Sequence, residues 1–454
     1  MFGLKPRGRI RKQTKEETRK KKKKRRGNDW CDTTSESSTS ILNLNDDDKE
    51  IAIREILSRL LVKSLMRFEC VCKHWFILIQ EDSSFRELHL NRSKARPGLF
   101  MACRMDVKDI FMTADLSFEG RSGIISAAVV NTIKDVDDTL YDRILEPVNG
   151  LIRFFGQEIT PGVRISNLST REETPWIKSK LLSKIREEER GYSGLSIPLA
   201  DCKLGYDPAT QKHKVLGIWK SYQPDFEVCE VLTVGDNKWR KIDEIPPYGI
   251  HYYGSSVYLN GSIYYTTHML TSSKPDDNDE PKFIVAFDVG SEKFRAIEVP
   301  NFIFDGPGDG DFVIFRSVKL LVLDGRLALL VRVQKKGSAP KLWLSGDDCV
   351  KENASGTWTE VPLELPFTLD GVQRWRGSFH PVLGTDQMVV TSTVLDGKIC
   401  DATHHSYNWK KMGASKIDIS GIPTSVPYFS SATSRITTFF ESLISVRRSR
   451  PCQL

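Results

Sequence analysis

The chain has 454 residues and a mass of 51.6 kDa, too long for one ordinary domain and suited to two or three. Hydrophobic residues make up 39% of it, a normal share for a globular protein, which excludes disorder of the whole chain. The net charge is +7, but residues 1–30 carry 14 Lys and Arg against 3 Asp and Glu. The remainder is therefore acidic overall, and nucleic acid is not an expected partner of the folded body.

Two further protein classes are excluded by pattern. No stretch approaches the roughly 18 uninterrupted apolar residues of a membrane span, so no membrane partner is expected. The N-terminus lacks the apolar core of a secretory signal. Nine cysteines, an odd number, then indicate reduced thiols. We expect a nuclear and/or cytoplasmic protein.

Residues 1–45 are expected to form a disordered tail, basic at first and then rich in Ser and Thr. Like charges repel, and almost nothing here is apolar enough to offset the entropy of ordering. One unbroken cationic run is a nuclear-import candidate, with a merely solvated tail as the alternative. Its residues are Lys20, Lys21, Lys22, Lys23, Lys24, Arg25 and Arg26.

Residues 46–92 are expected to form a small helical domain. Apolar side chains recur at steps of three and four, and no Pro or Gly interrupts the segment from Ile51 to Phe85. One stripe contains Ile53, Ile56, Leu57 and Leu60; a second contains Leu65, Phe68, Cys72, Trp75 and Ile79. A unit of about 40 residues has too little core to be secure alone, so it requires a partner or a neighbouring domain.

From about Pro97 the hydrophobic period changes to two, which predicts a mostly antiparallel all-β body over residues 97–446. Asn-Gly or Asp-Gly between apolar runs is a strong hairpin signal, because type I′ turns need positive φ at both central residues. It occurs at Asn149-Gly150, Asn260-Gly261, Asp324-Gly325 and Asp396-Gly397. With residues 204–245, these hairpins indicate about five four-stranded units and hence a β-propeller; a pair of β-sandwiches is the alternative.

Three smaller expectations accompany the propeller. The charged segment 177–190 is expected to be a helical surface insertion. Seven tryptophans from Trp176 to Trp409 are expected to pack between repeats rather than to line a ligand face. The runs near Phe100 and in residues 424–446 are expected to pair, because unpaired first and last strands would leave exposed sheet edges.

The segment Glu55–Ile79 resembles the F-box, particularly the plant type. The matching residues include Glu55-Ile56-Leu57, Arg59-Leu60, Val62-Lys63-Ser64-Leu65, Cys70-Val71-Cys72-Lys73 and Trp75. The remaining chain resembles the associated domain of these proteins, through Leu204-Gly205-Tyr206-Asp207-Pro208, Asn260-Gly261 and Phe287-Asp288-Val289 among others. Lys49 and Leu61 stand where the family usually has prolines, and Asn167-Leu168-Ser169 replaces Asn-Pro-Ser. Because Lys49 and Leu61 replace prolines, we expect weaker docking on the adaptor than in a family member with both prolines.

The resemblance implies an α+β multidomain chain, a small helical F-box followed by a kelch-like β-propeller. It further implies the substrate-recognition subunit of an SCF-type ubiquitin ligase. The F-box would dock on a Skp-type adaptor and through it on a cullin, while the β body would bind an unidentified target protein. An F-box-derived binding module with no working ligase role is the alternative. The residues expected to bind the adaptor are Leu57, Leu60, Leu65, Val71 and Trp75; spacing leaves open which of them face the adaptor and which the internal core.

No catalytic residue, metal site or cofactor is expected. Cys400-x-x-x-His404-His405 is the nearest approach to a metal cluster, but it lacks a fourth ligand at a familiar spacing. Cys70 and Cys72 are expected to pack in the helical core. The sequence has no HExxH, GxSxG or P-loop motif. An enzyme built on a propeller is therefore the least favoured hypothesis.

The cationic run generates a prediction about location. Replacing Lys20–Arg26 with Ser or Gln should move the protein toward the cytoplasm, because an import receptor recognises a compact positive run on an accessible arm. Fluorescence imaging of the tagged full-length chain measures the shift. An unchanged distribution would indicate a solvated tail or a second signal.

Overall fold

The protein is described by a computed structural model. It covers residues 46–105, 108–119, 123–137, 143–144, 146–156, 162–190, 199–222, 225–248, 255–267, 282–304, 318–331, 340–346, 357–365, 375–396, 399–421 and 435–447. The chain divides into two compact units, Met1–Glu55 and Ile56–Leu454. Helix α2 (Asp46–Leu57) occupies the described end of the first unit, where Arg54 pairs with Glu50 one turn earlier at 3.8 Å.

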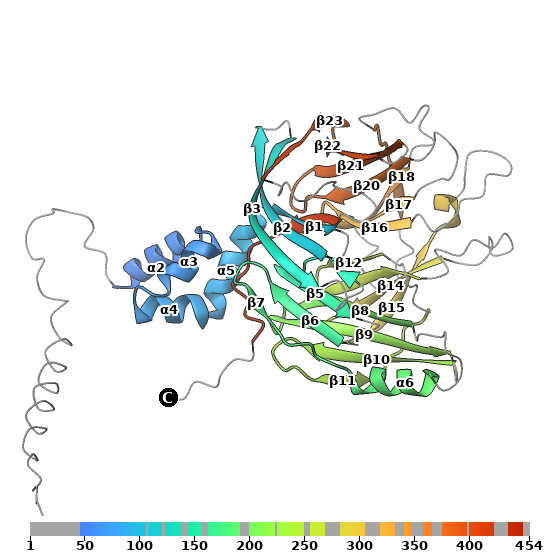
Figure 1. Cartoon of the computed structure of the whole chain (residues 1–454), viewed down its shortest axis with the longest axis horizontal. Helices are drawn as coiled ribbons and strands as arrows, with labels where there is room; N and C mark the ends of the chain where they lie inside the picture. The colour runs from blue at the N-terminus through green and yellow to red at the C-terminus, as the bar shows by residue number, and fades with distance from the viewer. Residues whose placement is uncertain are drawn as a thin grey trace, which may run out of the picture. The chain divides into compact units, whose positions relative to one another are not determined.

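Three further helices begin the second unit: α3 (Val62–Phe68), α4 (Lys73–Gln80) and α5 (Ser83–Lys94) (Figure 1). Their buried apolar residues are Val62, Leu65, Leu78, Ile79, Phe85 and Leu90, while Leu57, also buried, is the last residue of α2. Helix α5 begins at Asp82, whose Oδ1 accepts a hydrogen bond from the Phe85 amide at 2.9 Å. Cys70 and Cys72 are exposed in the turn between α3 and α4. The expectation that they pack in the core is wrong, because the helical stripe is interrupted there.

Six sheets form the body, one more than the hairpin count indicated. Five are consecutive four-stranded blades. Blade 1 is β4 (Arg143–Ile144), β5 (Leu151–Gly156), β6 (Gly162–Asn167) and β7 (Glu172–Glu173); blade 2 is β8 (Leu199–Asp207), β9 (Lys212–Tyr222), β10 (Asp225–Thr233) and β11 (Trp239–Ile242); blade 3 is β12 (Ser256–Leu259), β13 (Ser262–Thr266), β14 (Lys282–Asp288) and β15 (Phe294–Val299); blade 4 is β16 (Val318–Leu323), β17 (Arg326–Val331), β18 (Lys341–Ser345) and β19 (Trp358–Val361); blade 5 is β20 (Trp375–Pro381), β21 (Gln387–Asp396), β22 (Ile399–Asn408) and β23 (Gly413–Lys416).

The sixth blade is assembled from both ends of the body. β1 (Gly98–Met105), β2 (Lys108–Glu119) and β3 (Gly123–Asp137) lie side by side (Figure 1). β25 (Arg435–Phe439) pairs antiparallel with β1, placing Phe100 opposite Thr437, and β24 (Asp418–Ser420) pairs parallel with β3. The expected pairing of the C-terminal run with the run near Phe100 is confirmed. The count of five units was wrong because the sixth blade takes β1 to β3 from the start of the body and β24 and β25 from its end. Neither part alone shows the pattern of a four-stranded repeat.

The hairpin turns are confirmed at three positions. Asn149, Asn260 and Asp324 have φ of 48°, 46° and 51°, and the following glycines are also positive, as type I′ turns require. Asp396-Gly397 is different: Gly397 lies outside the described residues, and this pair separates the second strand of blade 5 from the third. It is therefore not equivalent to the other three turns, which precede the second strand of a blade.

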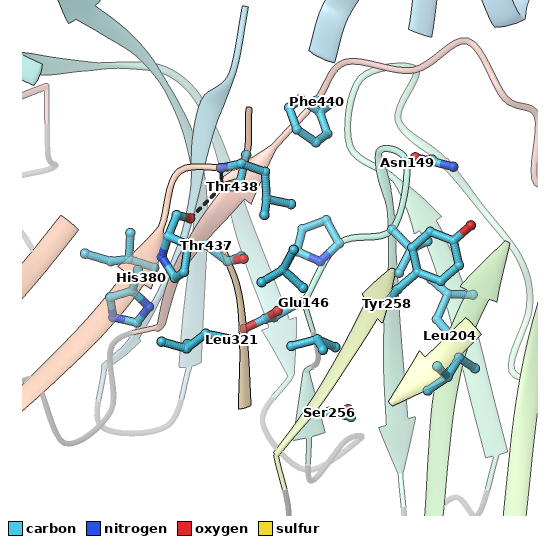
Figure 2. Close-up of a pocket in the computed structure, with 18 residues that line it drawn as sticks. Glu146, Asn149, Leu204, Ser256, Tyr258, Leu321, His380, Thr437, Thr438 and Phe440 are labelled. Atoms are coloured by element: carbon cyan, nitrogen blue, oxygen red, sulfur yellow. Dashed lines mark hydrogen bonds between the residues drawn. The ribbon is translucent and has the colours of Figure 1, made fainter. Parts of the chain in front are cut away.

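A central cavity of about 80 Å³ shows that the blades form a ring. The first strands of blades 2 to 5 contribute Leu204, Tyr258, Leu321 and His380, and β25 contributes Thr437 and Thr438 (Figure 2). Residues from one cavity thus come from blades that are distant in sequence, which excludes a pair of sandwiches. Since a water molecule occupies about 30 Å³, the cavity accommodates only a few waters.

Large apolar clusters lie between neighbouring blades. Trp343 and Trp358 pack with residues of blades 3 and 4, Trp219 with blades 1 and 2, and Trp409 with blades 4 and 5. Helix α6 (Lys180–Arg190) covers blade 2 with its buried Leu182 and Ile185. The expected tryptophan packing and the expected helical insertion are both confirmed for these residues. Among the described residues, no helix combines the length and apolar character that a membrane crossing requires.

The closing strand generates a stability prediction. Deleting residues 424–454 should lower the thermal midpoint of the whole body by about 10 °C or more, or leave it insoluble. The deletion removes Ile436, Phe439, Leu443 and Val446, each buried and each worth roughly 1.5–3 kcal/mol, and it exposes the edge of β1. Deleting only residues 448–454 is the matched control and should change little. A soluble 424–454 deletion that melts with the full chain would mean that the ring closes without β25.

Buried histidines generate a pH prediction. Burial lowers the pKa of His213 to about 4, partly opposed by the hydrogen bond from its Nε2 to the Val148 carbonyl oxygen at 2.9 Å. Below pH 6.5 the unfolded chain binds a proton that the native ring does not, so the free energy of unfolding falls as the pH drops toward 4. At pH 5 this loss is on the order of 2 kcal/mol.

His213→Gln keeps a donor for Val148 and removes the titration. The stability difference between wild type and this variant, measured by denaturant unfolding, should therefore narrow as the pH falls from 7.5 to 5. A difference that is constant with pH would contradict the assignment. Burial also lowers the pKa of His404 to about 4, with His405 adding to the effect, so the variant should retain part of the acid sensitivity.

Candidate functional site

We call residues 56–94, which include helices α3 to α5, the helical segment. The predicted adaptor-binding residues divide between its interior and its surface. Leu57 and Leu65 are buried, Leu65 completely, so neither presents a side chain to a partner in this state. Leu60 and Trp75 are partly buried, and the Trp75 ring meets Phe68 edge-on at 5.5 Å. Val71 is 63% exposed. The interpretation of Leu57 and Leu65 as contact residues is therefore revised: they support the helices from inside.

Three further apolar side chains of the segment are exposed that belong neither to the predicted stripes nor to the predicted contacts: Leu61, Phe76 and Ile77. Half of the large exposed apolar side chains found between residues 56 and 447 in the described ranges lie in residues 56–77, which marks this short segment as an interaction surface. They are Ile56 (62%), Leu61 (47%), Val71 (63%), Phe76 (44%) and Ile77 (41%). A signal was available, because α4 is apolar at five consecutive positions from Trp75 to Ile79. A helix that is apolar on several faces packs one face into the core and leaves a second apolar face, which a partner can bury.

Leu61 shows how the sequence departs from the family pattern without distorting the chain. Its backbone has φ of −66° and ψ of 147°, and it precedes the first turn of α3 as the N-cap residue. A proline ring fixes φ near −65°, so the backbone retains the conformation that the family's proline would impose. A leucine side chain, however, cannot accept a hydrogen bond from the first turn, and none caps α3 locally.

The helical segment contacts the ring at two polar points. The Glu441 carboxylate, beyond β25, accepts a hydrogen bond from the Val62 amide at 3.1 Å. Gln211, in the β8–β9 turn, donates to Glu87 of α5 at 2.8 Å. A cleft of about 430 Å³ lies beside the second contact, lined by Arg86, Tyr206 and Lys212 among others. The described part of this cleft contains no paired nucleophile and base.

Tight turns occupy the end of the ring that meets α5. In four blades an Asn or Asp just before a tight turn accepts hydrogen bonds from backbone amides two or three residues later, and this turn chemistry was missed from the sequence. The four are Asn167, Asp207, Asp288 and Asn408. Positive φ then falls on the residue four positions later, at Arg171, Gln211, Glu292 and Met412.

The weaker candidates contribute nothing further. His404 and His405 are consecutive in β22, so their side chains point to opposite faces of the sheet and cannot share one ion. The side chain of Cys400 lies outside the described residues. Within the described ranges, no three His, Cys, Asp or Glu side chains gather as a metal site would require. The import candidate, Lys20–Arg26, also lies outside the described residues.

Comparisons with known proteins match both parts of this architecture. The family described as an F-box associated beta propeller domain matches residues 100–443, and the F-box domain matches residues 41–87. F-box protein At5g65850 of Arabidopsis thaliana is 31% identical over 324 residues, which cover 69% of this chain and 70% of that protein. F-box protein At1g30790 of the same plant is 28% identical over 365 residues, which cover 76% and 82%.

Solved structures are more distant. The β-propeller domain of the Trilobed protease from Pyrococcus furiosus aligns with a TM-score of 0.32 and 10% sequence identity, covering 71% of this chain and 84% of that one. Neither fold nor function is inferred from a similarity at that level.

Proposed function

We propose a function for this chain, which belongs to the F-box proteins that carry an F-box associated β-propeller domain. The proposed function is that of the substrate-recognition subunit of an SCF-type ubiquitin ligase. In this proposal the helical segment docks on a Skp-type adaptor and through it on a cullin. The ring holds a target protein and performs no chemistry itself. The protein acts in the nucleus and/or the cytoplasm.

The observation that carries the proposal is the exposed apolar surface of the helical segment. Val71, Phe76 and Ile77 lie in or next to α4, in a unit too small to bury both of its sides. Covering such side chains with a partner helix provides the hydrophobic stabilisation that the free chain lacks. Val71 is the sequence-predicted contact that the geometry supports best.

Target binding is proposed for the end of the ring opposite the tight turns. In an antiparallel four-stranded blade, the turn between the first two strands and the turn between the last two share one end. The remaining connections, such as residues 267–281 between β13 and β14, therefore start and finish at the other end. These connections include the longest of the body, and long loops on a rigid frame are suited to recognition.

Two substitutions separate surface from core. Val71→Ser and Phe76→Ser should weaken adaptor binding by about 1–3 kcal/mol each, with the thermal midpoint nearly unchanged, because both side chains are exposed. Leu65→Ala should instead lower the free energy of unfolding by about 2–5 kcal/mol, because it leaves a cavity in the core. Binding is measured by calorimetry with a purified Skp-type adaptor, and stability by thermal unfolding.

Ile245→Ser is the matched control, since Ile245 is 57% exposed on the ring and distant in sequence from the helices. Equal losses of affinity in all three surface variants would contradict a specific docking surface. A folded wild-type chain with no affinity for the adaptor would favour the alternative, a protein-binding module without a ligase role. Adaptor binding without ubiquitin transfer to any captured protein would favour the same alternative.

A further inference from the structure

The eight residues that follow the closing strand connect three parts of the fold. We call Phe440–Arg447 the C-terminal clasp. It leaves β25 in blade 6, contacts the start of α3, and runs along the last turn of blade 1. Leu443 and Val446 are buried, and Val446 joins the apolar cluster of blades 1 and 2. The clasp is therefore part of the packed body.

At the helical segment, the clasp supplies the cap that α3 lacks. Val62 is the first residue of α3, and its amide has no acceptor from the Leu61 side chain. Glu441 Oε2 accepts from this amide at 3.1 Å, although the two residues are 379 positions apart. A carboxylate at this position also interacts favourably with the positive end of the helix. Glu441 thus fixes the N-terminal end of α3 against blade 6.

At blade 1, the Asn167 side chain joins the clasp to the β6–β7 turn. Its Nδ2 donates to the carbonyl oxygens of Ser442 and Ile444, at 2.9 and 2.8 Å. Its Oδ1 accepts from the amides of Ser169 and Thr170 and so holds the β6–β7 turn. The Asn167 side chain is buried, so each of these bonds replaces one that water would otherwise make.

Two neighbours of Asn167 complete the anchor. Glu172 Oε2 accepts from the Ser445 hydroxyl at 2.8 Å and from the Val446 amide at 3.2 Å. Gly150 allows the close approach: a Cβ there would lie 2.4 Å from the Ser442 Cβ and 2.7 Å from the Phe440 carbonyl oxygen. Glycine is thus required at position 150 twice, for the positive φ of the turn and for the passage of the clasp.

We propose that the C-terminal clasp positions the helical segment on the ring, with Asn167 as its anchor in blade 1 and Glu441 as its contact with α3. The clasp directly continues β25, whose pairing with β1 closes the ring, so one continuous segment both closes the ring and orients α3. The biological role of this coupling between ring closure and the orientation of α3 rests on the proposed function. A target held by the ring would keep a constant direction relative to an adaptor held by the helices.

The test is hydrogen–deuterium exchange of the full chain in the absence of any adaptor. Asn167→Asp keeps the acceptor for the turn but places a carboxylate against two carbonyl oxygens. Exchange in peptides covering residues 61–66 and 441–446 should become about tenfold faster, while strands β13 and β17 stay protected. Asn408→Asp is the matched control, because Asn408 Oδ1 holds the equivalent turn of blade 5 and the clasp does not pass there. It should leave both peptides protected.

A second pair of variants acts from the other end of the clasp. Glu441→Ala removes the acceptor for Val62 and should deprotect residues 61–66 alone, which serves as the decisive variant if Asn167→Asp does not fold. Glu441→Gln keeps an acceptor and should retain the protection. Burial raises the pKa of Glu441, opposed by the Val62 amide, while Asp115 raises it further and Arg96 lowers it. The glutamine amide oxygen takes the place of Glu441 Oε2 as the acceptor for the Val62 amide, so this variant should be tolerated at pH 7.5.

Unchanged protection of residues 61–66 in Glu441→Ala would overturn the proposal, as would equal deprotection by the two Asn→Asp variants. Because exchange is measured on the free chain, loss of the proposed adaptor function would leave this result intact. Conversely, a chain that binds the adaptor normally but shows no effect in these variants would refute the clasp alone.

Discussion

The ring depends on one backbone contact, the antiparallel pairing of β25 with β1. It joins segments more than 300 residues apart, yet the entropic cost of such a long loop is modest. Lengthening a loop from about 100 to about 340 residues adds only about 1 kcal/mol, less than the roughly 1.5–3 kcal/mol from burying Phe439 alone. Without the pairing, β1 would present an open edge, and the inner strand of blade 6 would be missing from the central cavity.

Features encoded by local chemistry could be predicted from the sequence, and features that join distant segments mostly could not. Asn260-Gly261 and Asp324-Gly325 identify hairpins because the turn type itself demands those residues. Asp396-Gly397 is also a turn dipeptide, but it lies between the second and third strands of blade 5 and not between the first and second. The sequence pattern therefore misplaced the start of that repeat. The Asp207 and Asp288 turns carry their own signature, an acceptor side chain followed by a residue with positive φ, and a search for it would have located one tight turn in each of four blades.

The candidate interaction surface was predictable only in part, because helical spacing identifies a stripe but not what covers it. Leu65 and Val71 are both apolar residues of one short segment, yet one is in the core and the other is exposed. The continuous apolar run of α4 is the local indication of a second covered face. The contact between Glu441 and Val62 has no local indication at all, since a missing N-cap does not reveal which remote segment supplies the acceptor.

Polar contacts at the tight-turn end of the ring support the proposal that a target binds at the other end. Lys214 of blade 2 donates to the Val289 carbonyl oxygen and to Glu292 of blade 3, and it is largely buried. The more exposed Lys410 pairs with Asp324 across blades 4 and 5, a contact that stabilises little by itself. The apolar clusters therefore provide most of the stabilisation between blades. The polar contacts of Lys214 and Lys410 align the turns of neighbouring blades. Helix α5 and the clasp also contact turns at this end of the ring, through Gln211 and Asn167. Many polar groups there therefore already have partners within the chain. This agrees with the proposal that a target binds at the other end, where the connections between strands are long.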